Sequence, residues 1–136
     1  MTEPASPDKT PNKSPARILV VDDNAMARTL IERTLVRKGF EMVTASSGDE
    51  ALAAVAENPV DMIFLDLVMP GMSGMEVLQT LKADDRYRHI PVVVVSGSED
   101  MNAADDVKAA GAVEFLPKPV KPPDLHQSVE KYLGSN

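Results

Sequence analysis

The chain has 136 residues, enough for one domain with a substantial core. Its formal net charge of −7 argues against direct binding to nucleic acid, because phosphate backbones are bound by basic surfaces. The sequence contains no cysteine, which excludes disulfides and thiolate chemistry, and no apolar run approaches the roughly 18 residues that a membrane helix needs. We therefore expect a cytoplasmic protein that binds neither nucleic acid nor membranes directly.

The N-terminal segment differs in composition from the rest of the chain. Residues 1–16 carry prolines among Ser, Thr, Lys and Asp and offer nothing for a core, which predicts a disordered tail. Residues 17–136 are expected to form the single domain. This domain opens with a buried strand over residues 18–21, which ends in Asp22 and Asp23.

Apolar periodicity predicts the next three elements. Asn24 is typical of a helix N-cap and Gly39 of a helix end, so the two residues bracket a first helix. Its expected apolar face consists of Ala27, Leu30, Ile31 and Leu35. A strand over residues 40–45 follows, and then a second helix that Pro59 stops. The inward face of this second helix is expected to consist of Ala51, Leu52, Val55 and Ala56.

The third predicted strand leads into an acidic residue. Residues 62–65 are consecutive large apolar side chains, which is typical of a strand buried on both faces, and Asp66 follows them directly. A loop rich in Pro and Gly then precedes a helix that opens with Ser73 and Glu76 in capping-box register. Asp66 therefore has no helix to cap nearby. It needs water, a cation or a metal as its partner.

The second half of the chain continues the alternation of strands and helices. Residues 92–95 are all valine, which suits a buried parallel strand, and Ser96 follows them. A weakly anchored helix over residues 100–110 is expected to contact the core through Met101, Ala104 and Val107. A short strand over residues 113–117 leads to Lys118. The last helix carries an apolar stripe of Leu125, Val129, Tyr132 and Leu133.

Five alternations of strand and helix predict the fold class. We expect an α/β domain with a doubly wound, five-stranded parallel sheet and helices on both faces, because parallel strands need crossover connections. Each strand would then point its carboxyl end toward the same edge of the sheet, where open α/β sheets bind their ligands.

Four of the five predicted strands end in polar residues: Asp22 with Asp23, Asp66, Ser96 and Lys118. We expect these residues to meet at one edge of the sheet. Clustered carboxylates repel one another unless a cation lies between them, and Mg²⁺ suits a site of carboxylates, water and phosphate oxygens. A lysine and a hydroxyl opposite them would complete a phosphoryl-transfer pocket, in which an aspartate can itself accept the phosphoryl group.

These same segments resemble a known family. Residues 17–133 resemble the receiver domain of bacterial two-component response regulators. The matching segments occur in the family's order and each closes a predicted strand. They are Val-Val-Asp-Asp at 20–23, Leu-Asp-Leu-Val-Met-Pro-Gly-Met-Ser-Gly at 65–74, Val-Ser-Gly at 95–97 and Phe-Leu-Pro-Lys-Pro at 115–119. Any one of them is weak alone, whereas all four together are specific.

The resemblance implies a metal site and a phosphoacceptor. Asp66 would accept the phosphoryl group, and Asp66 and Asp23 would bind Mg²⁺ directly, with Asp22 holding it through water. The backbone carbonyl of Val68 would add a further ligand, and Mn²⁺ is expected to substitute for Mg²⁺.

The resemblance also implies a switch. Ser96 would bond a phosphoryl oxygen, and Lys118 would neutralise phosphoryl charge and pair with Asp66 beforehand. Phe115 would turn inward as Ser96 moves, so that Ser96 and Phe115 together report phosphorylation. The Lys118–Pro119 peptide bond is usually cis in this family, which the sequence alone cannot show.

At the level of the whole chain, the implied function is a phosphorylation-dependent signalling switch of a two-component phosphorelay. The strand order would be the flavodoxin-like 2-1-3-4-5. A histidine kinase or a histidine phosphotransfer domain would supply the phosphoryl group. A downstream protein would bind the face formed by the fourth helix, the fifth strand and the fifth helix. No output domain is expected in this chain, and its chemistry would be limited to its own phosphorylation and dephosphorylation, so it would not be an enzyme.

Simpler roles remain open for single residues. Asp22 could cap the first helix, Ser96 could be a turn residue before Gly97, and Lys118 could be merely solvated. Three other functions fit these residues less well. An aspartyl phosphatase usually needs a second Asp where this chain has Val68. A flavodoxin-like cofactor binder needs a phosphate loop where this chain has two acids. A receiver that no longer phosphorylates would lack an acid, Asp66 or Lys118, and all are present.

Overall fold

The computed structural model describes residues 15–97 and 102–134. The greater part of the expected tail and the expected start of the fourth helix, with Met101, lie outside the described residues. Strands and helices alternate as the sequence predicts. In chain order they are β1 (Arg17–Val21), α1 (Ala25–Val36), β2 (Glu41–Ala45), α2 (Gly48–Glu57), β3 (Met62–Asp66), α3 (Gly74–Ala83), β4 (Val92–Ser96), α4 (Asn102–Ala109), β5 (Glu114–Pro117) and α5 (Pro122–Leu133).

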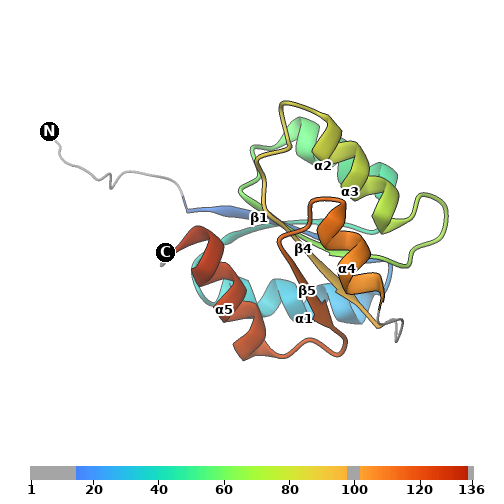
Figure 1. The fold of residues 1–136 in the computed structure, drawn as a ribbon. Coiled ribbons are helices and arrows are strands. Elements are labelled where there is room, and N and C mark those ends of the chain that lie inside the picture. Colours follow the sequence, from blue (N-terminus) through green and yellow to red (C-terminus); the bar gives the residue numbers. More distant parts are fainter. Residues whose placement is uncertain (1–14, 98–101, 135–136) are drawn as a thin grey trace, which may run out of the picture.

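The five strands form one parallel sheet in the order β2-β1-β3-β4-β5, so the expected fold class and strand order are both confirmed. Figure 1 shows α2 and α3 on one side of the sheet and α1 and α5 on the other. The register pairs Asp66 of β3 with Val95 of β4, and Ser96 of β4 with Pro117 of β5. The carboxyl ends of β3, β4 and β5 are therefore level with one another.

The sheet separates two hydrophobic clusters. Alternate residues of β1 serve opposite faces, with Leu19 and Val21 in one cluster and Ile18 and Val20 in the other. The first cluster packs α2, α3 and α4 onto the sheet, and the second packs α1 and α5 onto it. β3 and β4 are buried along their whole length, as their continuous apolar runs predict for central parallel strands.

Three helical residues lie differently from the prediction. Leu30 of α1 and Ala56 of α2 are exposed, because each helix buries a narrower stripe than its apolar residues would allow. In α4, Ala103 and Val107 are buried, whereas Ala104 is only half-buried. Periodicity identified these helices, but it did not fix their rotation about their own axes.

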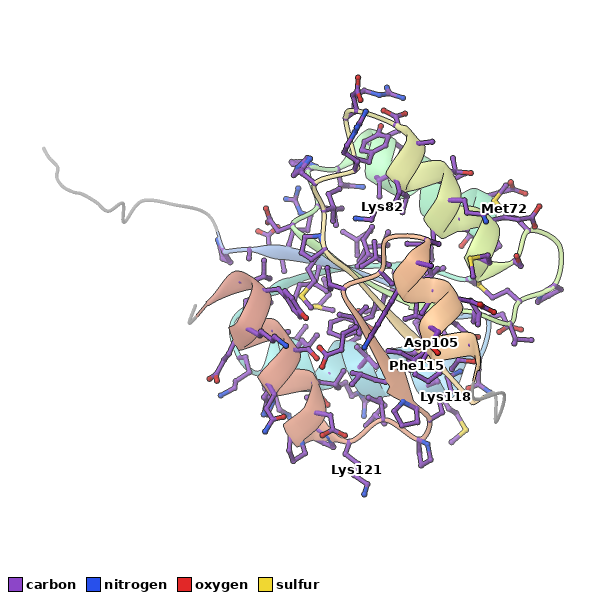
Figure 2. All side chains as sticks on the ribbon, in the orientation of Figure 1. Met72, Lys82, Asp105, Phe115, Lys118 and Lys121 are labelled. Carbon is purple, nitrogen blue, oxygen red and sulfur yellow. The ribbon has the colours of Figure 1, made fainter. Side chains whose placement is uncertain are left out.

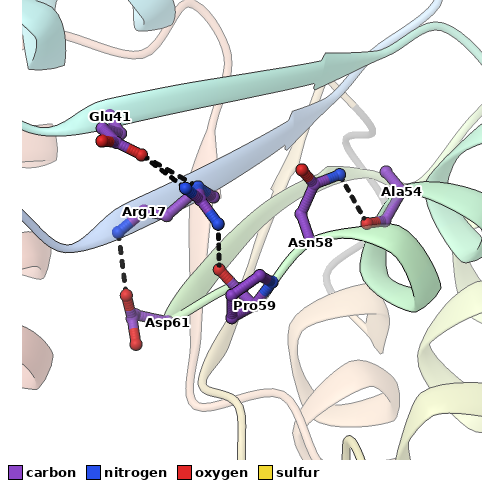
Figure 3. A network of polar contacts seen from close by, with 6 residues as sticks. All are labelled: Arg17, Glu41, Ala54, Asn58, Pro59 and Asp61. Carbon is purple, nitrogen blue, oxygen red and sulfur yellow. Dashed lines mark hydrogen bonds and ion pairs between the residues drawn. The ribbon is translucent and has the colours of Figure 1, made fainter. Parts of the chain in front are cut away.

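A polar network closes the amino end of the sheet (Figure 3). The Arg17 guanidinium donates to Glu41 Oε1 on β2, at 2.7 and 3.0 Å, and to the Pro59 carbonyl at 3.2 Å. The Arg17 amide donates to Asp61 Oδ2 at 2.8 Å. The network also includes Ala16, whose carbonyl accepts a hydrogen bond from the Glu41 amide. The sequence predicts Ala16 as the last residue of the tail. It joins β1, β2 and the connection into β3.

No helix among the described residues is long and apolar enough to cross a membrane.

Candidate functional site

The polar residues that end the strands gather at the carboxyl edge of the sheet. Asp22, Asp66 and Ser96 are buried, with exposed fractions of 2%, 5% and 0%. Asp23, the next residue after Asp22, is exposed. The structure thus brings two acids from the end of β1 to the acid at the end of β3, with the Ser96 hydroxyl on the neighbouring strand.

Lys118 supplies positive charge to the two buried acids. Its Nζ lies 2.9 Å from Asp22 Oδ2 and 3.6 Å from Asp66 Oδ2. The residue follows β5, and its amide donates to the Ser96 carbonyl at 2.9 Å, which extends the ladder between β4 and β5. Figure 2 shows Lys118 at the end of β5, below Phe115. Lys118 is therefore an ion-pair partner of the acids and not a solvated surface lysine.

The three acids form a group that suits a divalent cation. One carboxylate oxygen from each of Asp22, Asp23 and Asp66 can be chosen so that all lie within 4.8 Å of one another. Hard oxygen ligands at this spacing are what Mg²⁺ binds in proteins, usually together with water. Two of these acids are buried while the third faces solvent, which leaves one side of the group open.

Burial and repulsion perturb the acidity of the central carboxylate. The pKa of Asp66 is raised from 3.8 to about 6, chiefly by burial and then by the neighbouring charge of Asp22. Lys118 opposes this rise, as does the Val68 amide, which points at Asp66 Oδ1 across 3.4 Å. Burial lowers the pKa of Lys118, but its pairing with Asp22 and Asp66 outweighs that effect and the net shift is upward. In the metal-free site, the Asp66 carboxylate therefore binds a proton more tightly than an ordinary aspartate does.

The loop after β1 holds the first two acids in place. Asn24 caps α1, with Oδ1 accepting from the Ala27 amide at 2.9 Å, so the cap of this helix is not Asp22. Asp22 Oδ1 instead accepts from the Asn24 amide at 2.8 Å, and the Asp22 carbonyl accepts from Arg28 Nη1 at 2.7 Å. The Arg28 contact was not predicted, because one arginine on a helix face carries no sequence signal for a carbonyl in the preceding loop.

The end of the loop after β3 is hydrogen-bonded to the beginning of the same loop. The Gly74 amide, at the start of α3, donates to the Leu67 carbonyl at 2.9 Å. The predicted capping box is present, with Ser73 Oγ accepting from the Glu76 amide and the Glu76 carboxylate accepting from the Ser73 amide. Val68 lies on the open part of this loop with an exposed fraction of 68%.

An open cavity of about 560 Å³ lies over the acids. Its lining consists of Asp23, Asn24, Asp66, Val68, Gly97 and Lys118. Asn24 and Gly97 were not predicted as site residues, although each directly follows a predicted one in the sequence. The cavity gives a ligand of the size of a phosphoryl group direct access to Asp66.

The two expected switch residues lie on adjacent strands. Ser96 ends β4 and is fully buried, whereas Phe115 of β5 is half-buried and packs against the cluster under α2, α3 and α4. The register pairs Phe115 with Val94. The Lys118–Pro119 peptide bond is cis.

Comparisons with known proteins identify the class that this fold and site define. Residues 18–130 match the response regulator receiver domain family. The chain is 31% identical to the polar-differentiation response regulator DivK of Brucella anthropi over 88% of this chain and 98% of that protein. The chain belongs to the response regulator receiver domain family, and phosphorylation-dependent signalling is the function of that class.

Solved structures give the same result. The chemotaxis protein CheY4 of Vibrio cholerae superposes with a TM-score of 0.82 at 31% identity, covering 88% of this chain and 99% of that one. The receiver domain of NtrX from Brucella abortus gives 0.80 at 33% identity, covering 88% of this chain and 99% of that chain.

Proposed function

We propose that Asp66 accepts a phosphoryl group from a phosphohistidine or a small acyl phosphate, with Mg²⁺ bound beside it. Asp23 and Asp66 would hold the metal directly, Asp22 through water, and the Val68 carbonyl would contribute the backbone ligand. The observation that carries the proposal is the group of three acids within 4.8 Å, with Lys118 as counter-ion and an open cavity above. Mn²⁺ would serve in place of Mg²⁺.

The chemistry is the formation of an acyl phosphate. An oxygen of ionised Asp66 attacks phosphorus, and the bond from phosphorus to the donor breaks with its electron pair staying on the donor atom, an imidazole nitrogen in phosphohistidine. Bound Mg²⁺ supplies charge neutralisation for the phosphoryl oxygens. With its pKa at about 6, Asp66 is mostly ionised at neutral pH and ready to attack.

Two residues complete the site. Lys118 neutralises charge on the new phosphoryl group, because its ammonium already lies within 3.6 Å of Asp66 Oδ2. The Ser96 hydroxyl donates a hydrogen bond to a phosphoryl oxygen, because Ser96 ends β4, the strand next to the one that ends in Asp66. The chain catalyses its own phosphorylation and dephosphorylation and has no other substrate, so we do not class it as an enzyme.

The proposed donor is a histidine kinase or a histidine phosphotransfer domain in the cytoplasm. We place its docking surface on α1 beside the site, a proposal supported by the exposure of Met26 (83%) and Leu30 (44%). Arg33 and Arg37 lie beside these two residues in one groove. Exposed apolar side chains bordered by cations suit a partner helix that carries apolar and acidic residues.

The proposed output is a change of the face formed by α4, β5 and α5, which a downstream protein binds. Phe115 has no hydroxyl, so packing alone sets its orientation. Movement of Ser96 toward a phosphoryl group would vacate space for the ring, and full burial of such a side chain is worth about 1.5–3 kcal/mol. A difference of that size shifts a two-state equilibrium by roughly ten- to a hundredfold.

Acetyl phosphate tests the phosphoacceptor. The protein is incubated with acetyl phosphate and Mg²⁺, and its intact mass is measured with and without a chelator. We expect one phosphate adduct that needs the metal and is absent from Asp66→Asn. An adduct that persists in Asp66→Asn, or wild-type protein that never gains one, would contradict the assignment.

The output is tested separately through Phe115. We expect Phe115→Ala to be phosphorylated normally but not to transmit the signal as the wild type does. Phe115→Tyr should transmit the signal like the wild type. Amide exchange across residues 102–110, with and without a beryllofluoride mimic, reports transmission to α4. If Phe115→Ala responds to beryllofluoride as the wild type does, the ring is core filler and the switch lies elsewhere.

A further inference from the structure

The phosphoacceptor loop, residues 67–73, is pressed against the strand that it leaves. A Cβ at Gly74 would lie only 2.2 Å from the Asp66 carbonyl oxygen and 2.7 Å from Leu67 Cα. No real Cβ tolerates such contacts with backbone, so the close approach requires glycine. The α3 end of the loop is therefore fixed directly to the backbone of Asp66.

A second close contact fixes the other side of this loop. A Cβ at Gly48, the buried first residue of α2, would lie 2.8 Å from Met72 Cβ and 2.9 Å from both Met72 Cγ and Val77 Cγ2. Met72 is half-buried and packs against the cluster under α2, α3 and α4. Figure 2 shows Met72 on the side of the sheet that carries α2 and α3. Neither Gly48 nor Met72 lines the cavity over the acids.

These two contacts leave the phosphoacceptor loop little freedom. Gly74 holds one end of the loop to the Asp66 backbone, and Met72 is pressed into the hollow above Gly48. Val68, which supplies the proposed carbonyl ligand, lies in the exposed part between Asp66 and these anchors. Close-packed contacts transmit displacement, so lifting Met72 off α2 would move the backbone that carries Val68.

We propose that Met72, seated on Gly48, is a positioning residue for the metal and phosphoacceptor site. The proposal rests on the proposed function of Asp66 and Val68. In this proposal α2, a helix with no residue in the site, fixes the position of the phosphoacceptor loop through the contact between Gly48 and Met72. Groups that orient metal ligands typically change metal affinity by roughly 10- to 100-fold when they are removed.

A matched pair of methionines tests the proposal. Met72 and Met75 are both half-buried and both pack against the same cluster, but Met72, unlike Met75, supplies the atoms nearest to a Cβ at Gly48. In full-length protein, we compare Met72→Ala with Met75→Ala by thermal unfolding, by Mg²⁺ titration, and by amide exchange of residues 66–69 without metal. We expect similar losses of stability. We expect faster exchange and roughly tenfold weaker Mg²⁺ binding only in Met72→Ala.

Gly48→Ala provides an independent arm. Its new Cβ displaces Met72, so it should speed the same amide exchange and weaken Mg²⁺ binding. In the Met72→Ala background its effect should be smaller than in the wild type, because the Met72 contact is already lost and only the close approach to Val77 remains. The proposal would be overturned if Met72→Ala and Met75→Ala had equal effects on amide exchange. It would also be overturned if the losses of Mg²⁺ affinity from Gly48→Ala and Met72→Ala combined in full in the double variant.

Failure of the proposed function has a different signature. If wild-type protein bound no Mg²⁺, the metal site would be wrong, and the metal-free exchange data would decide on the positioning of the loop alone. Faster exchange confined to Met72→Ala and Gly48→Ala would then support the seat on α2. Unchanged exchange in both would overturn it.

Discussion

At the amino end of the sheet, Arg17 lies among acceptors: the carboxylates of Glu41 and Asp61 and the carbonyl of Pro59 all receive hydrogen bonds from it. At the carboxyl end, Asp22 and Asp66 share one ammonium group, that of Lys118, with Asp23 beside them. The first arrangement pairs the Arg17 guanidinium with Glu41 and gives the Asp61 carboxylate a backbone amide as its donor. The second leaves negative charge in excess around buried groups, and burial first, then the charge of Asp22, raises the pKa of Asp66 to about 6.

The difference separates structural polar groups from functional ones. The amino-end network holds β1, β2 and the connection into β3 together, and its Arg17–Glu41 ion pair is partly exposed to solvent (Figure 3). The carboxyl-end cluster is electrostatically unfavourable in the metal-free protein, and a cation or a proton relieves it. Unfavourable local arrangements of this kind are expected at functional sites, where the rest of the fold has to compensate for them.

Removing the counter-ion should have the largest effect on stability. Lys118→Met leaves Asp22, with an exposed fraction of 2%, without its ion-pair partner at 2.9 Å. Loss of one partner from a buried pair costs about 3 kcal/mol or more, so unfolding in denaturant at pH 7.5 should show a loss of that order. Mg²⁺ should restore part of it.

The control for Lys118→Met is Lys121→Met, since Lys121 is exposed at the start of α5 and makes no side-chain cap. We expect a change within about 0.5 kcal/mol there. A loss below about 1 kcal/mol in Lys118→Met would mean that the acids do not depend on this lysine.

Removing the central charge should stabilise the metal-free protein. Because the folded-state pKa of Asp66 lies above its ordinary value of 3.8, the folded chain binds this proton more tightly than the unfolded chain. The stability that this tighter proton binding adds to the folded state is fully present below about pH 3.8 and is lost as pH rises through about 6. Asp66→Asn should therefore exceed the wild type in stability at pH 8 by on the order of 1–3 kcal/mol, and the two should converge near pH 4.

Denaturant unfolding across that pH range, with a chelator present, measures this difference. Asp106→Asn on the exposed side of α4 is the control, and its difference from the wild type should not vary in the same way. Adding Mg²⁺ should stabilise the wild type and leave Asp66→Asn nearly unchanged. A variant that is less stable than the wild type at pH 8 would show that Lys118 outweighs the repulsion.

The sequence predicts the carboxyl end of the sheet better than it predicts the surroundings of the site. Asp22, Asp66, Ser96 and Lys118 follow apolar strands, and the geometry of a parallel sheet then brings such residues to one edge. The fold class and strand order follow from the same alternation.

What the sequence does not predict depends on contacts between distant segments. The seat of Met72 on Gly48 joins a loop to a helix from another part of the chain, and no periodicity encodes it. The burial of Ala103 in place of Ala104 reflects a rotation of α4 that neighbouring alanines leave undetermined. Leu30 is apolar yet exposed, because apolar character shows what a helix face is able to bury and not what covers it.

Breaking the amino-end network should have the smallest effect and should leave the site intact. The Arg17 and Glu41 side chains are 28% and 46% exposed, so their ion pair is worth at most about 1 kcal/mol. Arg17→Met keeps the aliphatic stem, and it keeps the amide that donates to Asp61, so it removes only the guanidinium contacts to Glu41 and Pro59. We expect a loss of about 1 kcal/mol in denaturant unfolding, with unchanged phosphorylation by acetyl phosphate.

A double-mutant cycle with Glu41→Gln isolates the ion pair within that loss. The coupling between Arg17 and Glu41 should be below about 1 kcal/mol and should shrink in high salt, because the pair is partly solvated. The remaining loss in Arg17→Met then belongs to the Pro59 carbonyl, which loses its donor. Phosphorylation that slowed in Arg17→Met would show that the two ends of the sheet are coupled, against the separation of structural and functional charges drawn from their geometry.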